Sequence, residues 1–368
     1  MKSRPRLIAV VFILFVVVGS IAIQGKRLLE DRTAAVVYAP NRTLDDLAQA
    51  NGVLPSELKY CLRYEMPKAD SVNVFQFADK SGVSETDFRR AIVRAREDDN
   101  PWRFVIRFLL WSILLAAATL WVMRRHNAAT IRRWILVGVW FLFGAWLGVV
   151  PNPLDSFVAV FQWLADRQGS PILMVGSVVL MAVLSVWGAK LLCGWGCPFG
   201  ALQEMLFYFR VLPRKYDFHF PFWLSLVIRV LVLAAFLTIL FGGWTVWGLS
   251  NLYEPVNGFK VFRFPQLTKP ILYSLAIFGV LSILMFRPFC QLVCPFGLLA
   301  WLLEKVSVYR IHIDPKRCTH CLKCVRACPT QAMKRIYDKK TLLPPDCWSC
   351  GECIESCSAR AISYKISP

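Results

Sequence analysis

Histidine and acidic residues are scarce in this sequence. Its 368 residues include 4 histidines, and 24 Asp and Glu residues stand against 43 Lys and Arg residues. The histidines all fall outside the long apolar runs of the chain: His126, His219, His312 and His320. A haem held inside a bilayer by two histidines needs both ligands within such runs. The sequence therefore excludes a haem of this kind, and we expect no haem.

Long apolar runs, by contrast, are abundant. The chain is 56% hydrophobic with a mean hydropathy of +0.48, which is too apolar for an ordinary soluble protein. A run must cross a hydrocarbon core of roughly 30 Å to span a membrane. Six runs are long enough: 7–24, 102–123, 132–150, 171–192, 222–241 and 270–287. We interpret 7–24 as a retained anchor, because no clean small-residue cleavage site follows it.

The charge distribution orients these runs. With the N-terminus inside, the basic loops 124–133 and 203–220 and the C-terminal segment 288–368 all face the cytoplasm, as the positive-inside rule expects. Segment 25–101 lies outside and carries 12 Lys and Arg against 13 Asp and Glu, a net charge of −1. We therefore attribute the net charge of +19 to the basic loops that orient the protein in the membrane. We expect no nucleic-acid partner. The sequence predicts a multi-pass protein of the bacterial cytoplasmic (inner) membrane, with 25–101 in the periplasm.

Twelve of the 13 cysteines fall on the cytoplasmic side of this topology. Disulfides are rare in that compartment, so clustered thiols there indicate metal or redox chemistry. The run Cys318-x2-Cys321-x2-Cys324-x3-Cys328-Pro has the spacing of bacterial ferredoxins. A second run repeats the spacing with Ser358 in place of proline: Cys347, Cys350, Cys353 and Cys357. The chain therefore ends in a segment typical of a dicluster ferredoxin.

In this motif the fourth cysteine of each run ligates the other cluster. We therefore assign one [4Fe–4S] cluster to Cys318, Cys321, Cys324 and Cys357. The second cluster is assigned to Cys347, Cys350, Cys353 and Cys328. The alternative is a pair of zinc sites, but zinc ligands usually come as two separated pairs. His320 lies between two predicted ligands and is interpreted as a neighbour of the cluster.

Two further cysteine pairs close long apolar runs in the motif C-x-x-x-C-P-F-G: Cys193 with Cys197, and Cys290 with Cys294. Cysteines at i and i+4 share one face of a helix end, and the following proline interrupts the helix. Four thiols brought together at the inner surface could hold a third iron–sulfur cluster or another thiophilic metal. A dithiol redox relay and four structural thiols are the alternatives.

The paired motifs belong to a longer internal repeat. Before each motif comes a P-x-x-x-F pattern, with Pro153 and Phe157 in the first copy and Pro255 and Phe259 in the second. Both copies then run from outside to inside, which predicts a parallel repeat related by an axis along the membrane normal. Such an axis brings the two cysteine pairs opposite each other.

Two cations near these motifs invite a functional interpretation. Arg229 lies inside an apolar run, where an ionisable group usually marks a site or a pairing. It could hold a quinone or a ferredoxin-side carboxylate, or it could snorkel to the interface. Lys190 precedes Cys193 by three residues and could stabilise thiolates or anchor the helix end. Trp244 fits an interfacial aromatic belt, and a quinone pocket shared with Phe157 or Phe259 is the alternative.

The outer segment 25–101 contains its own repeat. Residues 47–53 align without gaps with 77–83, and each copy is expected to form a helix, a glycine stop and a second helix. Cys61 occupies the place of Ala91 in the second copy, which predicts a core position. We interpret the segment as a docking module for a periplasmic redox protein, with a plain structural cap as the alternative.

Residues 102–368, with their twelve cysteines in order, resemble the NapH/MauN type of membrane polyferredoxin. The membrane and ferredoxin parts of NosR belong to the same group. The resemblance implies membrane-bound electron transfer between the quinone pool and an extracytoplasmic reductase or dehydrogenase system, in which the chain is a quinol dehydrogenase component. It also implies a partner ferredoxin subunit. The outer segment is shorter than the flavin-bearing domain of NosR, so no covalent flavin is expected.

The predicted fold is a six-helix transmembrane bundle with an internal parallel repeat, a small α-helical outer domain and an α+β dicluster ferredoxin domain. The expected boundaries are 1–24 for the anchor, 25–101 for the outer domain, 102–309 for the membrane domain and 310–368 for the ferredoxin domain. The predicted function is iron–sulfur electron transfer, with no catalytic residue assigned. The alternative is a copper-reducing assembly or maturation factor that binds metal at the paired cysteines.

Overall fold

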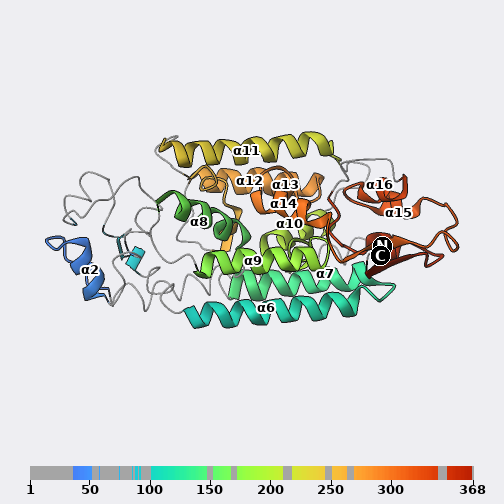
Figure 1. Cartoon of the computed structure of the whole chain (residues 1–368), viewed down its shortest axis with the longest axis horizontal. Helices are drawn as coiled ribbons and strands as arrows, with labels where there is room; N and C mark the ends of the chain where they lie inside the picture. Colours follow the sequence, from blue (N-terminus) through green and yellow to red (C-terminus); the bar gives the residue numbers. More distant parts are fainter. Residues whose placement is uncertain are drawn as a thin grey trace.

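The computed structural model describes residues 36–51, 58, 74, 85, 88–89, 91–92, 101–146, 152–166, 172–209, 218–244, 251–262, 269–338 and 346–366. The chain is elongated, with helix α2 at one end, long helices in the middle and the C-terminal strands and short helices at the other end (Figure 1). The predicted anchor 7–24 and Cys61 lie outside the described residues.

Five long helical stretches coincide with five of the predicted apolar runs. They are α6 (Pro101–Val122), α7 (Ala128–Val139) with its π-helical continuation η1 (Trp140–Trp146), α9 (Ile172–Trp187), α11 (Phe222–Gly242) and α12 (Lys269–Leu284). Among the described residues, Ala128–Ala145 and Phe222–Gly242 are long and apolar enough to cross a membrane. Four shorter helices are also apolar: Phe108–Val122, Met174–Trp187, Lys269–Leu284 and Pro295–Glu304. A bundle of six spans therefore stays a prediction.

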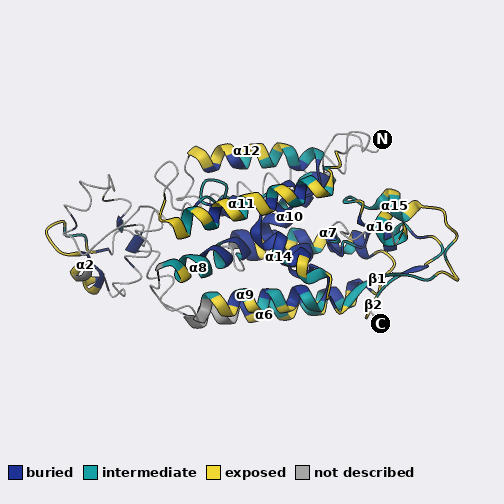
Figure 2. Ribbon diagram, turned by 45° about the horizontal axis from the view of Figure 1, so that its top comes forward, coloured by how far each residue is buried: buried dark blue, intermediate teal, exposed yellow. Residues whose placement is uncertain are grey.

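Short helices fill the space between the long ones. They are α8 (Pro153–Asp166), η2 (Leu192–Gly196), α10 (Pro198–Phe209), η4 (Gly258–Phe262), α13 (Pro288–Leu292) and α14 (Pro295–Glu304). Figure 2 shows dark, buried residues concentrated on α10 and α14, whereas the long α11 and α12 carry exposed residues on their outer faces. The chain therefore turns back into the bundle after each long helix that leads to a cysteine pair.

Proline determines where α10 and α14 begin. Pro198 and Pro295 are the first residues of these helices, a position at which the missing N–H group costs nothing. The preceding cysteines have extended backbones, with φ −78° and ψ 115° at Cys197 and φ −62° and ψ 116° at Cys294. The two C-x-x-x-C-P motifs thus share one local conformation, as a repeated sequence predicts.

The C-terminal part combines a two-stranded sheet with short helices. Strands β1 (Tyr309–Ile313) and β2 (Ile362–Ile366) pair antiparallel, with Ile311 opposite Tyr364. Helices α15 (Lys323–Ala327), α16 (Ala332–Asp338) and α17 (Glu352–Glu355) lie between them in sequence. This arrangement agrees with the predicted α+β class for this part of the chain.

The described residues of the outer segment form a small separate core. Helix α2 (Leu44–Ala50) begins at Thr43, whose hydroxyl accepts a hydrogen bond from the Asp46 N–H in a capping box. Leu47, Leu58 and Phe88 are fully buried together, and Ala91 is 2% exposed in the same core. Corresponding positions of the two sequence copies therefore share one core.

Candidate metal centres

All twelve cysteines outside the outer segment are described, and none of them forms a disulfide. Four line one cavity together: Cys328, Cys347, Cys350 and Cys353. This set contains one cysteine from the first ferredoxin run and three from the second, which is the set that the sequence assigns to the second cluster. The donor set and the cavity fit a cubane held by residues of both runs.

Burial controls the chemistry of these thiols. It raises the pKa of the Cys350 thiol to about 12, although Arg132 opposes the shift. It also raises the pKa of Cys347 well above its ordinary value, and the Glu304 carboxylate acts in the same direction. Such thiols stay protonated at neutral pH until a metal displaces the proton. We infer that iron must reach this site together with the removal of protons.

Of the cysteines assigned to the first cluster, one is exposed, two are half-buried and Cys357 is buried. Cys318 and Cys357 both act electrostatically on Cys324, so the structure brings these three together. Cys321 is exposed, and the backbone N–H of Lys323 lowers the pKa of its thiol. The His320 ring contacts the Tyr337 hydroxyl, which agrees with its interpretation as a neighbour of the cluster.

The four paired cysteines come together, but in the interior of the protein. Cys193, Cys197, Cys290 and Cys294 are each 6–7% exposed, and Cys193 lies within electrostatic range of the other three. They are buried because the chain folds back after each long helix and the loop of the second ferredoxin run packs on them. Their predicted position at the inner membrane surface stays a prediction. Within the described residues no three His, Cys, Asp or Glu side chains are arranged to hold a single metal ion.

Polar hydrogens point at two of these sulfur atoms. The Gly200 N–H donates to Cys197 Sγ at 3.4 Å, and Gln203 Nε2 donates to Cys290 Sγ at 3.4 Å. Hydrogen bonds to sulfur ligands tune the reduction potential of an iron–sulfur cluster. The thiols therefore have partners suited to their charged, metal-bound form.

One cation precedes each cysteine pair by three residues, and each reaches the other motif. Lys190 and Arg287 both have left-handed backbones, with φ 58° and φ 49°, a conformation that is uncommon for residues other than glycine. Lys190 Nζ donates to the Gly297 carbonyl at 3.3 Å. Arg287 Nη1 donates to the Cys193 carbonyl. Each cation therefore contacts the other motif, at carbonyl groups that are not equivalent in the two copies, and the internal repeat stays a prediction.

Two buried carboxylates compensate the cations. Glu204 accepts hydrogen bonds from Arg132 Nη2 and from Arg287 Nε, each at 2.8 Å. Burial alone would raise the pKa of Glu204, but the two guanidinium groups outweigh it and hold the pKa below its ordinary value. Asp346 pairs with Lys190 and, at 3.1 Å, with Arg229 Nη2.

These pairs decide between the sequence interpretations of Lys190 and Arg229. Both cations are fully buried and bind Asp346, which directly precedes the predicted ligand Cys347. Arg229 therefore holds a ferredoxin-side carboxylate, one of the expected possibilities, and Lys190 is not an interface anchor. Sequence reasoning missed Arg132, Glu204 and Arg287. A comparison of the two repeat copies would have found Arg287, because it occupies the place of Lys190.

The loop of the second cluster rests directly on the first cysteine pair. Trp195 Nε1 donates to the Ser349 carbonyl at 3.0 Å, and Ser349 Oγ donates to the Ala189 carbonyl at 2.9 Å. The buried Trp348 ring faces Lys190 Nζ at 4.6 Å and the Arg287 guanidinium at 5.1 Å. The two candidate centres are therefore adjacent.

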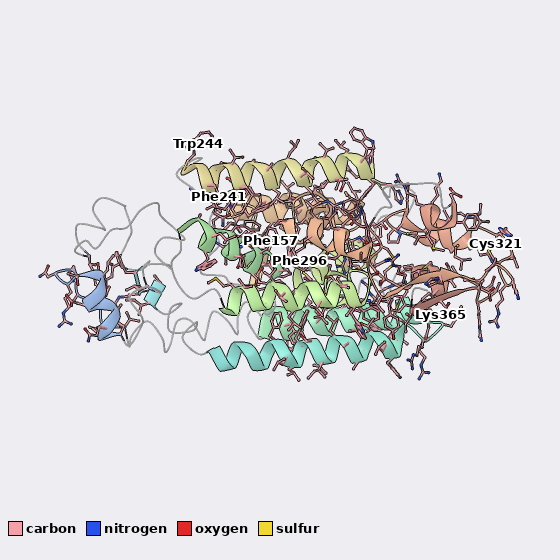
Figure 3. All side chains as sticks on the ribbon, viewed as in Figure 1. Phe157, Phe241, Trp244, Phe296, Cys321 and Lys365 are labelled. Atoms are coloured by element: carbon pink, nitrogen blue, oxygen red, sulfur yellow. The ribbon has the colours of Figure 1, made fainter. Side chains whose placement is uncertain are left out.

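On the opposite side, the segment 251–262 covers the paired cysteines. The ring of Phe259 packs against that of Phe199, two residues after Cys197, with centroids 5.5 Å apart. Asn257 Nδ2 donates to Asp155 Oδ1 at 2.7 Å, and these two residues hold equivalent places after Pro255 and Pro153. Trp244 is 63% exposed while Phe259 is buried, and the quinone pocket suggested by sequence stays a prediction. Figure 3 likewise shows Trp244 at the edge of the molecule and Phe157 in its interior.

The close contact between Gly194 and the Trp348 carbonyl group allows a test of how the loop of the second site packs on the first cysteine pair. A Cβ atom on Gly194 would overlap the Trp348 carbonyl oxygen, whereas a Cβ on Gly138 meets nothing within 4 Å. We expect Gly194→Ala to destabilise the folded chain by about 1–3 kcal/mol, the cost of overpacking. Gly138→Ala is the matched control and should leave stability unchanged or higher. Thermal unfolding in detergent measures both, and equal melting temperatures would contradict the described docking.

Comparisons with known proteins agree with these sites. A model of the 4Fe–4S dicluster domain matches residues 310–358. A model described as a 4Fe–4S binding domain matches twice, at 169–217 and at 270–313, so that each match contains one cysteine pair. No solved structure matches the chain.

Curated relatives have similar descriptions. A ferredoxin-type protein NapH of Haemophilus influenzae is 26% identical over 72% of this chain and 91% of its own length. A methylamine utilization ferredoxin-type protein MauN of Methylobacillus flagellatus is 25% identical over 50% of this chain and 63% of its own length. A regulatory protein NosR of Pseudomonas aeruginosa is 26% identical over 58% of this chain and 30% of its own length.

The cysteine sites and the family matches define an iron–sulfur electron-transfer protein. Within that class the chain is similar to the NapH/MauN/NosR type of polyferredoxin, and the resemblance seen in the sequence is confirmed.

Proposed function

We propose that the chain is a multi-pass polyferredoxin of the bacterial inner membrane that relays electrons between the quinone pool and an extracytoplasmic reductase or dehydrogenase system. The proposal rests on one observation: three cysteine sites lie next to one another in space. An exposed site at Cys321 is followed by the cavity that contains Cys328 and Cys347, and the loop of that cavity rests on the cysteine pairs. Clusters bound there would supply carriers of single electrons.

The membrane location is supported by the outer faces of the long helices. Ile113, Leu231 and Val280 are 60–65% exposed, on α6, α11 and α12 respectively. Large exposed apolar patches are uncommon on soluble monomers and mark contact with a membrane or another protein. Together with the six apolar runs and the basic loops on one side, they favour a bundle of spans with the ferredoxin part in the cytoplasm.

The charge around the paired cysteines favours a bound anion. Four cations are buried beside the motifs with 0–1% exposure, namely Arg132, Lys190, Arg229 and Arg287, and two carboxylates of 1% exposure face them, Glu204 and Asp346. Uncompensated buried cations are costly, and four neutral thiols would leave this excess uncompensated. Thiolates around a cubane carry net negative charge and would balance it. We therefore propose a third [4Fe–4S] cluster at Cys193, Cys197, Cys290 and Cys294.

The outer segment would then serve a partner. Its position at the far end from the ferredoxin part (Figure 1) and its near-neutral charge suit a docking module for a periplasmic redox protein. The segment 251–262 reaches the cysteine pairs from this same end.

Reduction by a quinol analogue tests this function. The anaerobically purified chain is mixed with the analogue, and cluster signals are followed by electron paramagnetic resonance. We expect signals of reduced clusters to appear, and a midpoint near that of the quinone couple for at least one centre. Clusters that stay oxidised with quinol, yet are reduced by a low-potential donor, would reverse the proposed direction of electron flow.

A further inference from the structure

The site assigned to the first cluster opens at the far tip of the ferredoxin part. Cys321 is exposed, and its neighbour Leu322 is 45% exposed. Figure 3 shows Cys321 at the edge of the molecule farthest from the long helices, whereas Lys365 lies closer to them. By contrast, Cys353 of the second site and all four paired cysteines are buried. A soluble carrier would therefore reach the chain of sites at this tip.

Exposed cations lie close to Cys321: Arg326 Nη2 donates to the Cys321 carbonyl at 3.2 Å, and the Lys323 ammonium acts electrostatically on its thiol. Four exposed cations of this stretch form a surface that we call the basic tip: Lys316, Arg317, Lys323 and Arg326. Two carboxylates lie in the same stretch. Asp314 is paired with Arg317 at 3.6 Å, and Asp338 is exposed. The basic tip thus combines a partly apolar centre at Leu322 with a positively charged rim.

We propose that the basic tip binds an acidic soluble electron-transfer protein, one that carries carboxylates around its own redox centre. The inference rests on the proposed function and adds a partner to it. Complementary charge steers such partners and raises their association rate, and apolar contacts near the centre of the interface exclude water. The single electron passes between the partner's redox centre and the first cluster, so one is oxidised as the other is reduced.

The position of the tip argues against anionic lipid as the occupant. Basic residues that bind lipid headgroups lie within a Debye length of the membrane surface. Cys321, beside Lys323 and Arg326 of the basic tip, lies at the edge of the ferredoxin part away from the long helices whose apolar faces are exposed (Figure 3). The surface therefore fits a protein in solution.

Charge reversal at two exposed lysines tests the proposal. Lys316→Glu with Lys323→Glu changes the tip, and Lys365→Glu is the matched control, because it reverses an exposed lysine of the same part away from Cys321. Full-length chains in phosphatidylcholine nanodiscs are mixed with a reduced acidic [2Fe–2S] ferredoxin or with the methyl viologen radical cation. We expect the double variant to react about tenfold more slowly with the ferredoxin at low ionic strength, and no more slowly with viologen.

Added salt should narrow the difference between the double variant and the wild type, while Lys365→Glu should follow the wild type within about twofold. An unchanged ferredoxin rate, or an equal loss with both donors, would overturn the docking surface. These outcomes presuppose iron-loaded protein, which is checked first by metal analysis. A wild-type chain without iron would contradict the proposed function itself.

Discussion

Replacing all four paired cysteines by serine should lower the iron content of the anaerobically purified chain from about twelve to about eight atoms, the loss of one cubane of three. The reason is that Cys193, Cys197, Cys290 and Cys294 are gathered in one buried site, beside an excess of buried cations. Iron and acid-labile sulfide are measured on the same samples. The two ferredoxin sites use other cysteines and should keep their resonance signals.

Cys61→Ser is the matched control for this experiment, since Cys61 lies in the outer segment and belongs to neither cysteine motif. It should leave the iron content unchanged. Iron that stays the same after the fourfold replacement would remove the third cluster. Copper recovered at the paired cysteines, in place of iron and sulfide, would favour a copper-reducing assembly factor instead.

Glu204→Gln should be among the most destabilising single substitutions in the chain. It keeps the shape of the side chain but removes the carboxylate charge that compensates Arg132 and Arg287, both buried with 0–1% exposure. Breaking a buried ion pair by removing one partner costs about 3–5 kcal/mol, because the remaining charge has no counterion. Thermal unfolding in detergent measures the loss.

Glu85→Gln provides the comparison, because the ion pair of Glu85 with Arg89 is partly exposed, at 51% and 28%. Pairs of that kind contribute less than about 1 kcal/mol. The two substitutions should therefore differ clearly in melting temperature. Equal and small effects would mean that Glu204 does not compensate the buried guanidinium groups.

The predicted cysteine sites depend on local patterns in the sequence, and their assignment to clusters stays a prediction. The 2-2-3 spacing of the ferredoxin runs predicted that Cys328 belongs with three cysteines of the other run, and one cavity contains all four. The long helices were also predictable, because apolar runs of that length form few structures other than long helices. In both cases the signal lies within a short window of residues, and long-range contacts are not needed to interpret it.

Contacts between distant segments were not predictable in the same way. The pairing of Asp346 with Lys190 and Arg229 joins residues 156 and 117 positions apart. The sequence offered a carboxylate as one of several partners for Arg229 and predicted none for Lys190. Burial of the cysteine pairs was not predictable from hydropathy either, because it depends on contacts such as that of Phe259 with Phe199.

Metal and sulfide analysis of the anaerobically purified wild-type chain tests the central claim most directly. Thiolates of the two ferredoxin runs and of the cysteine pairs should yield a brown protein with more than about eight iron atoms per chain and a matching amount of acid-labile sulfide. A colourless protein that contains zinc, with neither iron nor sulfide, would contradict the account.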